Sequence, residues 1–249
     1  KMDRIEFHCA GSYSELSPWQ REEICLRMED DRRDFQELYR EMVLILLMGD
    51  PSRKNKKRVQ RLLSEISIEQ LLPLGKFLLT DRDLFSFPEI WDGLTTPLPR
   101  LSNCTIRQFS VADMLFYQYS KKREELYARQ LVASLYCWGA SEFDPLLLPK
   151  IAEVTDSISP GTRAAIVFAY RCTREYIIER YPAVFPKSSY REDTPIFRRQ
   201  GDYTPFSKVI AAMAMDSTQP LGNWHECSAT RLYDFLEILN ESILRSKRT

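Results

Sequence analysis

Histidine and glycine are scarce in this sequence, and their scarcity excludes several kinds of active site. The chain has only two histidines, His8 and His225, and eight glycines. Two histidines leave little material for a catalytic triad or a histidine-rich metal cage. The motifs G-x-x-x-x-G-K-[ST], G-x-G-x-x-G and G-x-S-x-G, which cradle phosphates or hold a nucleophilic serine, do not occur. We therefore expect a protein that is not an enzyme, with no catalytic, cofactor-binding or metal-binding residues and no cofactor.

The chain also lacks net charge and long apolar runs. Its 35 basic side chains balance 35 acidic ones, which argues against bulk attraction to nucleic acid or to anionic lipid. The longest apolar run, 42–48, is far shorter than a membrane span, and 1–11 has no apolar core of signal-peptide length. These features predict a cytoplasmic protein without a membrane partner.

Closely spaced cysteines are missing too. The six cysteines are scattered without any C-x-x-C pair, at Cys9, Cys25, Cys104, Cys137, Cys172 and Cys227. A disulfide scaffold is usually short and rich in cysteine, so this pattern favours reduced and mostly buried thiols.

One short segment invites comparison with a zinc protease. His225-Glu226-Cys227 begins like H-E-x-x-H, the pattern that places two histidine ligands on one helix face. Ala229 occupies the position of the second histidine, and alanine cannot bind a metal. We therefore interpret His225 as a structural residue in the first turn of a helix.

Helix signals, by contrast, are abundant. Ser17-Pro18 and Ser159-Pro160 each place a capping hydroxyl before a proline at the first helical position. Apolar side chains then recur at helical spacing. The helices that we predict cover 17–30, 35–48, 52–65, 67–79, 110–136, 144 onward, 160–181, 205–215 and 223–247.

Two of these predictions rest on polar residues at capping spacing. Ser110, with Asp113 three residues later, is expected to cap the helix that runs to about Tyr136. Asn223, with Glu226 three residues later, is expected to open the last helix. Sustained strand-type alternation does not occur. The sequence thus predicts an all-α fold: a single-domain irregular bundle of about eight to ten helices over 1–249.

A long proline-containing loop at 80–103 interrupts this pattern. Pro88, Pro97 and Pro99 break any helix there, so a division of the chain, if there is one, is predicted at this loop. Long ordered loops often bind partners. The aromatic side chains of Phe87 and Trp91 in the loop, together with Trp138, are therefore the candidates for binding a protein partner. Core packing is the alternative for each of them.

A basic run is the most conspicuous charge feature. It consists of Arg53, Lys54, Lys56, Lys57 and Arg58, with Arg61 one turn later. These side chains could contact a phosphate backbone along one helix edge, which makes a nucleic-acid-binding regulator the alternative function. The run contains no aromatic residue to stack on bases, and the neutral net charge favours a solvated helix start instead.

Several short segments, spread over roughly the last three-fifths of the chain, are informative through their order and spacing. They are Asn103-Cys104-Thr105, Phe109, Ala112-Asp113, Leu131-Val132-Ala133-Ser134-Leu135-Tyr136, Phe143-Asp144, Tyr203, Phe206, Val209-Ile210 and Ala214, followed by a terminal helix ending at Lys247. In this order the chain resembles small helical proteins encoded in the tail-assembly modules of tailed bacteriophages. That group usually continues the Leu-Tyr pair with Arg-Pro, whereas this chain has Cys137-Trp138. A contact shared at this turn is therefore in doubt.

The resemblance implies a role in assembly rather than in catalysis. It suggests a chaperone for the tape-measure protein or a virion-associated factor, with a tail or tape-measure protein as the partner. Self-association is a further option, which the near-zero net charge favours. The resemblance also implies action in the host cytoplasm or in the virion. The resemblance supplies no catalytic residues, and none are assigned.

Overall fold

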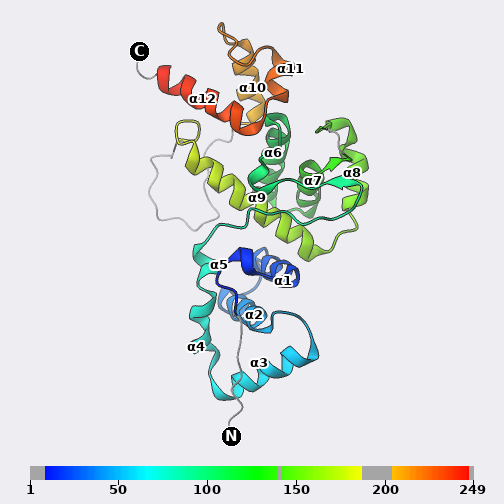
Figure 1. Cartoon of the computed structure of the whole chain (residues 1–249), viewed down its shortest axis with the longest axis vertical. Helices are drawn as coiled ribbons and strands as arrows, with labels where there is room; N and C mark the ends of the chain where they lie inside the picture. Colours follow the sequence, from blue (N-terminus) through cyan, green and yellow to red (C-terminus); the bar gives the residue numbers. More distant parts are fainter. Residues whose placement is uncertain (1–8, 140–141, 187–203, 247–249) are drawn as a thin grey trace. The chain divides into compact units, whose positions relative to one another are not determined.

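The computed structural model describes residues 9–139, 142–186 and 204–246, and the described chain is mainly helical (Figure 1). It contains twelve α-helices: α1 Pro18–Met28, α2 Phe35–Met48, α3 Arg53–Glu65, α4 Ile68–Leu71, α5 Phe77–Thr80, α6 Ile106–Lys122, α7 Glu125–Leu135, α8 Leu148–Thr155, α9 Pro160–Arg180, α10 Phe206–Met215, α11 Trp224–Ala229 and α12 Leu232–Ser246. Two short strands, β1 Leu94–Thr95 and β2 Cys137–Trp138, pair antiparallel. The predicted all-α class is confirmed.

Contacts group the chain into two compact units. Unit 1 comprises Lys1–Leu84 with Ser159–Cys172, and unit 2 comprises Phe85–Ile158 with Thr173–Thr249. The first boundary, after Leu84, falls within the loop at 80–103, and the prediction of one domain stays a prediction. Within the described residues, no helix combines the length and the apolar composition that crossing a membrane requires.

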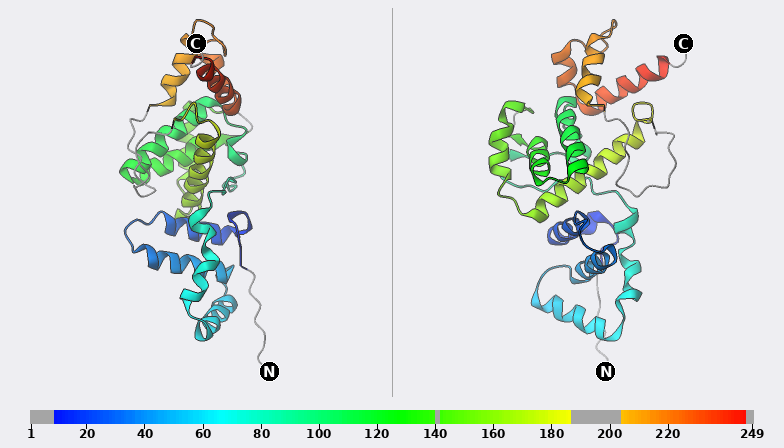
Figure 2. Two further views of the ribbon diagram at one scale, coloured as in Figure 1. Left: turned by 90° about the vertical axis from the view of Figure 1, so that its left-hand side faces the viewer. Right: turned by 180° about the vertical axis from the view of Figure 1, so that it is seen from behind.

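In unit 1, the helices α1 and α2 lie side by side (Figure 1 and Figure 2). Ser17 caps α1 in a capping box with Gln20, as the sequence predicts, and Gly49 ends α2 with a positive φ of 70°. The side chain of Gln20 also reaches across to α2, where its Nε2 donates to the carbonyl oxygens of Ile45 at 3.2 Å and Leu46 at 3.0 Å. This glutamine therefore caps its own helix and binds the end of its neighbour.

The apolar face of α3 packs against the same part of unit 1. Val59 is buried in a cluster with residues of α2 and α4, and Leu62 and Leu63 pack against this cluster. These are inner-face residues that helical spacing predicts. The opposite face of α3 therefore points away from the cluster.

In unit 2, α6 and α7 repeat the construction seen in unit 1. Thr105 caps α6, and Gln108 occupies the third helical position, as Gln20 does in α1. The Nε2 group of Gln108 donates to the carbonyl oxygens of Ser134 at 3.0 Å and Leu135 at 2.9 Å, at the end of α7. The chain enters β2 two residues later, so this contact fixes the start of the small sheet.

An ion pair joins α6 to the second half of α9. Asp113 is buried at 1% exposure, and its Oδ1 lies 2.5 Å from Nε of Arg174. The arginine side chain remains 28% exposed and lies near the ring of Phe116. The pair therefore brings a charged carboxylate into the core of unit 2 with its counter-ion reaching the surface.

The helix count exceeds the eight to ten that we expect, because several predicted helices are broken. The apolar helix toward Leu79 is split into α4, a 3-10 turn at Leu72–Gly75 and α5, since Pro73 cannot continue an α-helix. The last predicted helix is interrupted between α11 and α12, where Leu232 N donates to Cys104 O and Ile106 N donates to Thr230 O. Pairing with a distant segment ends α11 there.

The prediction that Ser110 caps a helix running to Tyr136 is wrong. Ser110 lies buried inside α6, whose cap is Thr105, and Arg123 adopts a left-handed φ of 56° that separates α6 from α7. Asp113, read from the sequence as the partner in that cap, instead binds Arg174.

Candidate functional site

Two of the predicted partner-binding residues lie together at the small sheet of unit 2. The strands pair Leu94 with Trp138 and Thr95 with Cys137. This register brings the ring of Trp91, three residues before Leu94, to 5.3 Å from the ring of Trp138. Trp91 is 45% exposed and Trp138 is partly exposed, so the pair forms an aromatic surface rather than part of the core.

The backbone around Trp91 is built for this placement. A Cβ atom on Gly93 would lie 1.9 Å from Cζ3 of Trp91, so only glycine lets the indole fold back onto the chain. Gly93 O also accepts a hydrogen bond from Gly139 N at 2.9 Å, which closes the turn beside β2. Upstream, the buried Tyr136 donates its hydroxyl to Pro88 O at 2.6 Å. These contacts fix the loop that carries Trp91.

A lysine completes the surface. Nζ of Lys150, on α8, lies 3.7 Å from the centroid of the Trp138 ring, close enough for a cation–π contact. Lys150 is exposed and has no carboxylate partner within the described residues. We call Trp91, Trp138 and Lys150 the tryptophan platform. Its chemistry suits an apolar side chain flanked by a carboxylate.

Phe87, the third predicted partner-binding residue, lies elsewhere. Its side chain is only 8% exposed and belongs to the core of unit 2. It helps to anchor the loop of Trp91 but presents no surface to a partner.

The basic run lies on α3 of unit 1. Five of its six residues are exposed and form no ion pair with the part of the chain that the structure describes: Arg53, Lys54, Lys56, Lys57 and Arg61. The sixth, Arg58, is half-buried and its Nη1 lies 3.4 Å from the side-chain oxygen of Asn55. We call the five exposed cations the basic face.

Several other arginines of unit 1 differ from the basic face because they bind carboxylates. Arg27 contacts Glu23 at 2.6 Å and Glu41 at 2.9 Å, and Arg171 contacts Glu29 at 2.6 Å. The hydrogen bonds from Arg33 and then Arg27 hold the pKa of Glu41 below its usual value, despite partial burial. Ion pairs are thus common in unit 1, but the cations of the basic face form none with the described residues.

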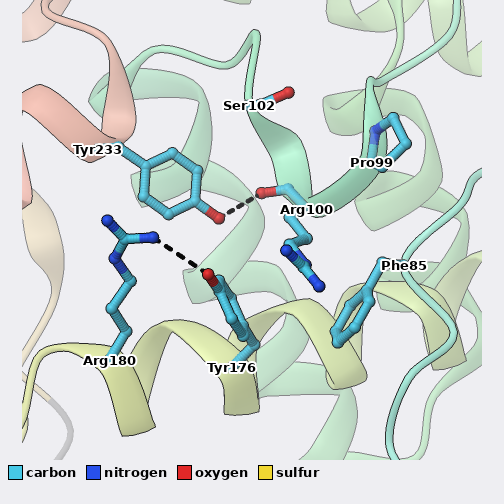
Figure 3. A pocket seen from close by; sticks show the side chains of 7 residues that line it. All are labelled: Phe85, Pro99, Arg100, Ser102, Tyr176, Arg180 and Tyr233. Carbon is cyan, nitrogen blue, oxygen red and sulfur yellow. Dashed lines mark hydrogen bonds between the residues drawn. The ribbon is translucent and has the colours of Figure 1, made fainter.

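A second candidate site in unit 2 was not indicated by the sequence. A hollow of about 410 Å³ opens between the loop before α6 and the helices α9 and α12 (Figure 3). We call it the arginine hollow; it is lined by Phe85, Pro99, Arg100, Ser102, Tyr176, Arg180 and Tyr233. The one signal in the sequence is the four-residue spacing of Tyr176 and Arg180, which places them one turn apart on α9.

The remaining reactive residues do not gather into a site among 9–139, 142–186 and 204–246. No group of three histidine, cysteine or acidic side chains in these residues could hold a metal ion, and no disulfide joins the six cysteines. His225 lies in the first turn of α11, where its backbone N–H donates to Asn223. Burial raises the pKa of the Cys25 and Cys104 thiols, which therefore stay neutral.

Comparison with known proteins returns no relative: no protein-family model, curated protein or solved structure matches the chain.

Proposed function

We propose that this protein is a non-enzymatic interaction factor that binds a protein partner through the tryptophan platform. The observation that carries the proposal is the pairing of two tryptophan rings 5.3 Å apart beside the small sheet, one exposed (Trp91) and one partly exposed (Trp138). Tryptophan is the residue type most enriched among residues that dominate binding energy. A pair of fixed indoles loses little conformational entropy when a partner binds.

The chemistry of the platform indicates what the partner offers. The indoles suit a bulky apolar side chain, and the ammonium of Lys150, which has no carboxylate partner within the described residues, suits a carboxylate near it. An amphipathic helix presents both kinds of side chain one turn apart. The resemblance of the chain, in the order of its short segments, to phage tail-assembly proteins favours a long helical tail component, the tape-measure protein, as this partner. The protein would then act in the host cytoplasm during assembly, or remain in the virion.

Replacing both indoles is expected to abolish this interaction. The Trp91→Ala/Trp138→Ala variant should bind a co-expressed tape-measure segment at least about 30-fold more weakly than the parent chain, since each hot-spot residue contributes about 2 kcal/mol or more. Lys150→Glu should weaken the same complex through repulsion. Co-purification followed by calorimetric titration measures both effects.

The control for this experiment is Trp224→Ala, because Trp224 is an exposed tryptophan of unit 2 outside the platform. This variant should bind like the parent. Equal binding by the double variant, or a monodisperse parent chain that binds no tail component, would contradict the proposal. A platform that binds a second copy of the chain would instead give a dimer in light scattering that the double variant loses, and this also contradicts it.

The basic face supports a second candidate function, contact with the phosphate backbone of a nucleic acid. Arg53, Lys57 and Arg61 follow one another at four-residue spacing, on the side of α3 opposite its buried face. Cations in the first turn of a helix oppose the helix dipole, and here no acidic residue in that turn offsets them. A bound phosphate would offset the repulsion between these cations and the positive end of the helix dipole. The repulsion would persist if the start of the helix contacted only water.

Reversing three of these charges tests the second candidate. The variant Lys54→Glu/Lys57→Glu/Arg61→Glu is expected to lose binding to a DNA duplex by about 10-fold or more at low salt, and to flatten its dependence on salt. Fluorescence anisotropy with a labelled duplex measures both. The control reverses three exposed cations of unit 2, as Arg107→Glu/Lys121→Glu/Lys208→Glu. Equal losses in the two variants would show that only net charge matters and would remove this candidate.

A further inference from the structure

The arginine hollow contains one guanidinium group that lies between two aromatic rings. The Cζ atom of Arg100 lies 4.6 Å from the ring centroids of both Phe85 and Tyr176. The two rings meet edge to face at 5.6 Å, so the guanidinium lies in the angle between them (Figure 3). Stacking on aromatic faces restricts a guanidinium plane while leaving its N–H edges accessible.

The backbone of Arg100 is fixed as well. It adopts a left-handed conformation, with φ 59° and ψ 21°, which is strained for a residue other than glycine. Both of its backbone polar groups are held: Arg100 N donates to Phe85 O at 3.2 Å, and the Tyr233 hydroxyl donates to Arg100 O at 2.7 Å. Strain of this kind persists where the surroundings enforce it, and it is concentrated at binding sites.

The two arginines of the hollow differ in what they bind. Arg180 donates to the Tyr176 hydroxyl at 3.1 Å and to Glu237 at 3.2 Å (Figure 3 draws the first contact). Arg100 is an exposed residue, and its guanidinium has no hydrogen-bond acceptor within the described residues. Its coplanar N–H groups are therefore available for a bidentate acceptor.

From this geometry we propose that the arginine hollow binds a carboxylate attached to an apolar body. The carboxylate pairs with the N–H edge of Arg100, and the apolar body lies against the rings of Phe85, Tyr176 and Tyr233. The volume of about 410 Å³ falls within the range of small-ligand sites. The proposal does not depend on the tryptophan platform.

Local charge favours a singly charged carboxylate over a phosphate. The two arginines contribute two positive charges, and Glu237 on Arg180 cancels one of them. A phosphate group carries close to two negative charges at neutral pH, so one would remain uncompensated beside Glu237. A carboxylate also matches the planar fork of one arginine.

A pair of matched ligands tests the proposal on the full chain. N-acetylphenylalanine is expected to bind at least about 10-fold more tightly than its amide, because only the acid forms the charge-assisted pair. Arg100→Lys should lower the affinity for the acid by about 10-fold and leave the amide unaffected, since lysine lacks the planar fork. Isothermal titration calorimetry measures both.

Three further variants separate this site from general effects. Tyr233→Phe removes the hydroxyl that holds Arg100 O and should weaken acid binding, whereas Arg107→Lys, an exposed arginine on α6, should not. Acid binding should survive in Trp138→Ala, which keeps this outcome separate from that of the platform. A tripeptide ending in phenylalanine distinguishes two sources of the carboxylate. It should bind more tightly than N-acetylphenylalanine if the site takes the C-terminus of a polypeptide, and no more tightly if the site takes a small acid.

The proposal fails if acid and amide bind equally, if Arg100→Lys binds the acid like the parent, if inorganic phosphate binds more tightly than the acid, or if the acid shows no saturable binding.

Discussion

Arg174→Met is expected to lower the free energy of unfolding by about 3–5 kcal/mol, because it leaves the carboxylate of Asp113 buried without its counter-ion. Asp113 is 1% exposed, and Arg174 is its hydrogen-bonding partner at 2.5 Å. Methionine keeps most of the aliphatic part of the side chain and removes the guanidinium, whose Cζ lies 6.0 Å from the centroid of the Phe116 ring, so the loss is mainly electrostatic. Urea denaturation followed by circular dichroism measures the change.

Two further variants separate the buried charge from general disruption of α9. Asp113→Asn/Arg174→Met removes both charges, so it should be more stable than Arg174→Met alone. Arg129→Met breaks exposed pairs with Glu125 and Asp156 and should cost less than about 1 kcal/mol. Equal stability of Arg174→Met and Arg129→Met would show that the pair of Asp113 and Arg174 contributes no more than a surface contact.

Asp113 also shows why the sequence predicts local structure better than tertiary contacts. The caps at Ser17 and Asn223 are confirmed, since each satisfies backbone N–H groups only two or three positions away. Asp113, at similar spacing from Ser110, suggested another cap, yet its carboxylate binds a residue 61 positions later. Local spacing alone cannot distinguish these two outcomes.

The candidate sites show the same difference between local features, which the sequence predicts, and tertiary contacts, which it does not. Helical spacing predicted which face of α3 is buried, so the exposure of its cations could be anticipated. Trp91 and Trp138 were predicted only as separate candidates, because their contact depends on strands of two residues, too short for an alternating pattern. The position of Arg100 could not be predicted, since a left-handed φ at arginine has no sequence signature.

The two buried glutamines illustrate how a local motif acquires a tertiary role. Gln20 and Gln108 each occupy the third position of a capped helix and bind carbonyl oxygens at the end of the next one. In unit 1, the Ile45 carbonyl also accepts from Gly49 N, so Gln20 is partly redundant. In unit 2, Gln108 is the donor that binds the carbonyl oxygens of Ser134 and Leu135, among the described residues outside α7. Gln108 is therefore the more critical of the two.

Gln108→Leu is accordingly expected to destabilise unit 2 by about 2–4 kcal/mol, because two buried carbonyl oxygens lose their donor. Gln108 is 3% exposed, so water cannot replace the amide without opening the contact between α6 and α7. Gln130→Leu, at an exposed position of α7, is the matched control and should change stability by less than about 0.5 kcal/mol. Urea denaturation compares the two.

The same substitution should also alter the tryptophan platform. Gln108 Nε2 lies 3.6 Å from Sγ of Cys137, which directly precedes Trp138 in β2, so releasing the end of α7 loosens the strand that carries one of the two indoles. We expect the near-ultraviolet circular dichroism signal of the paired indoles to fall in Gln108→Leu under conditions where the helices remain folded, and to persist in Gln130→Leu. An unchanged indole signal in a destabilised Gln108→Leu would mean that the sheet pairing with β1, rather than the end of α7, positions Trp138.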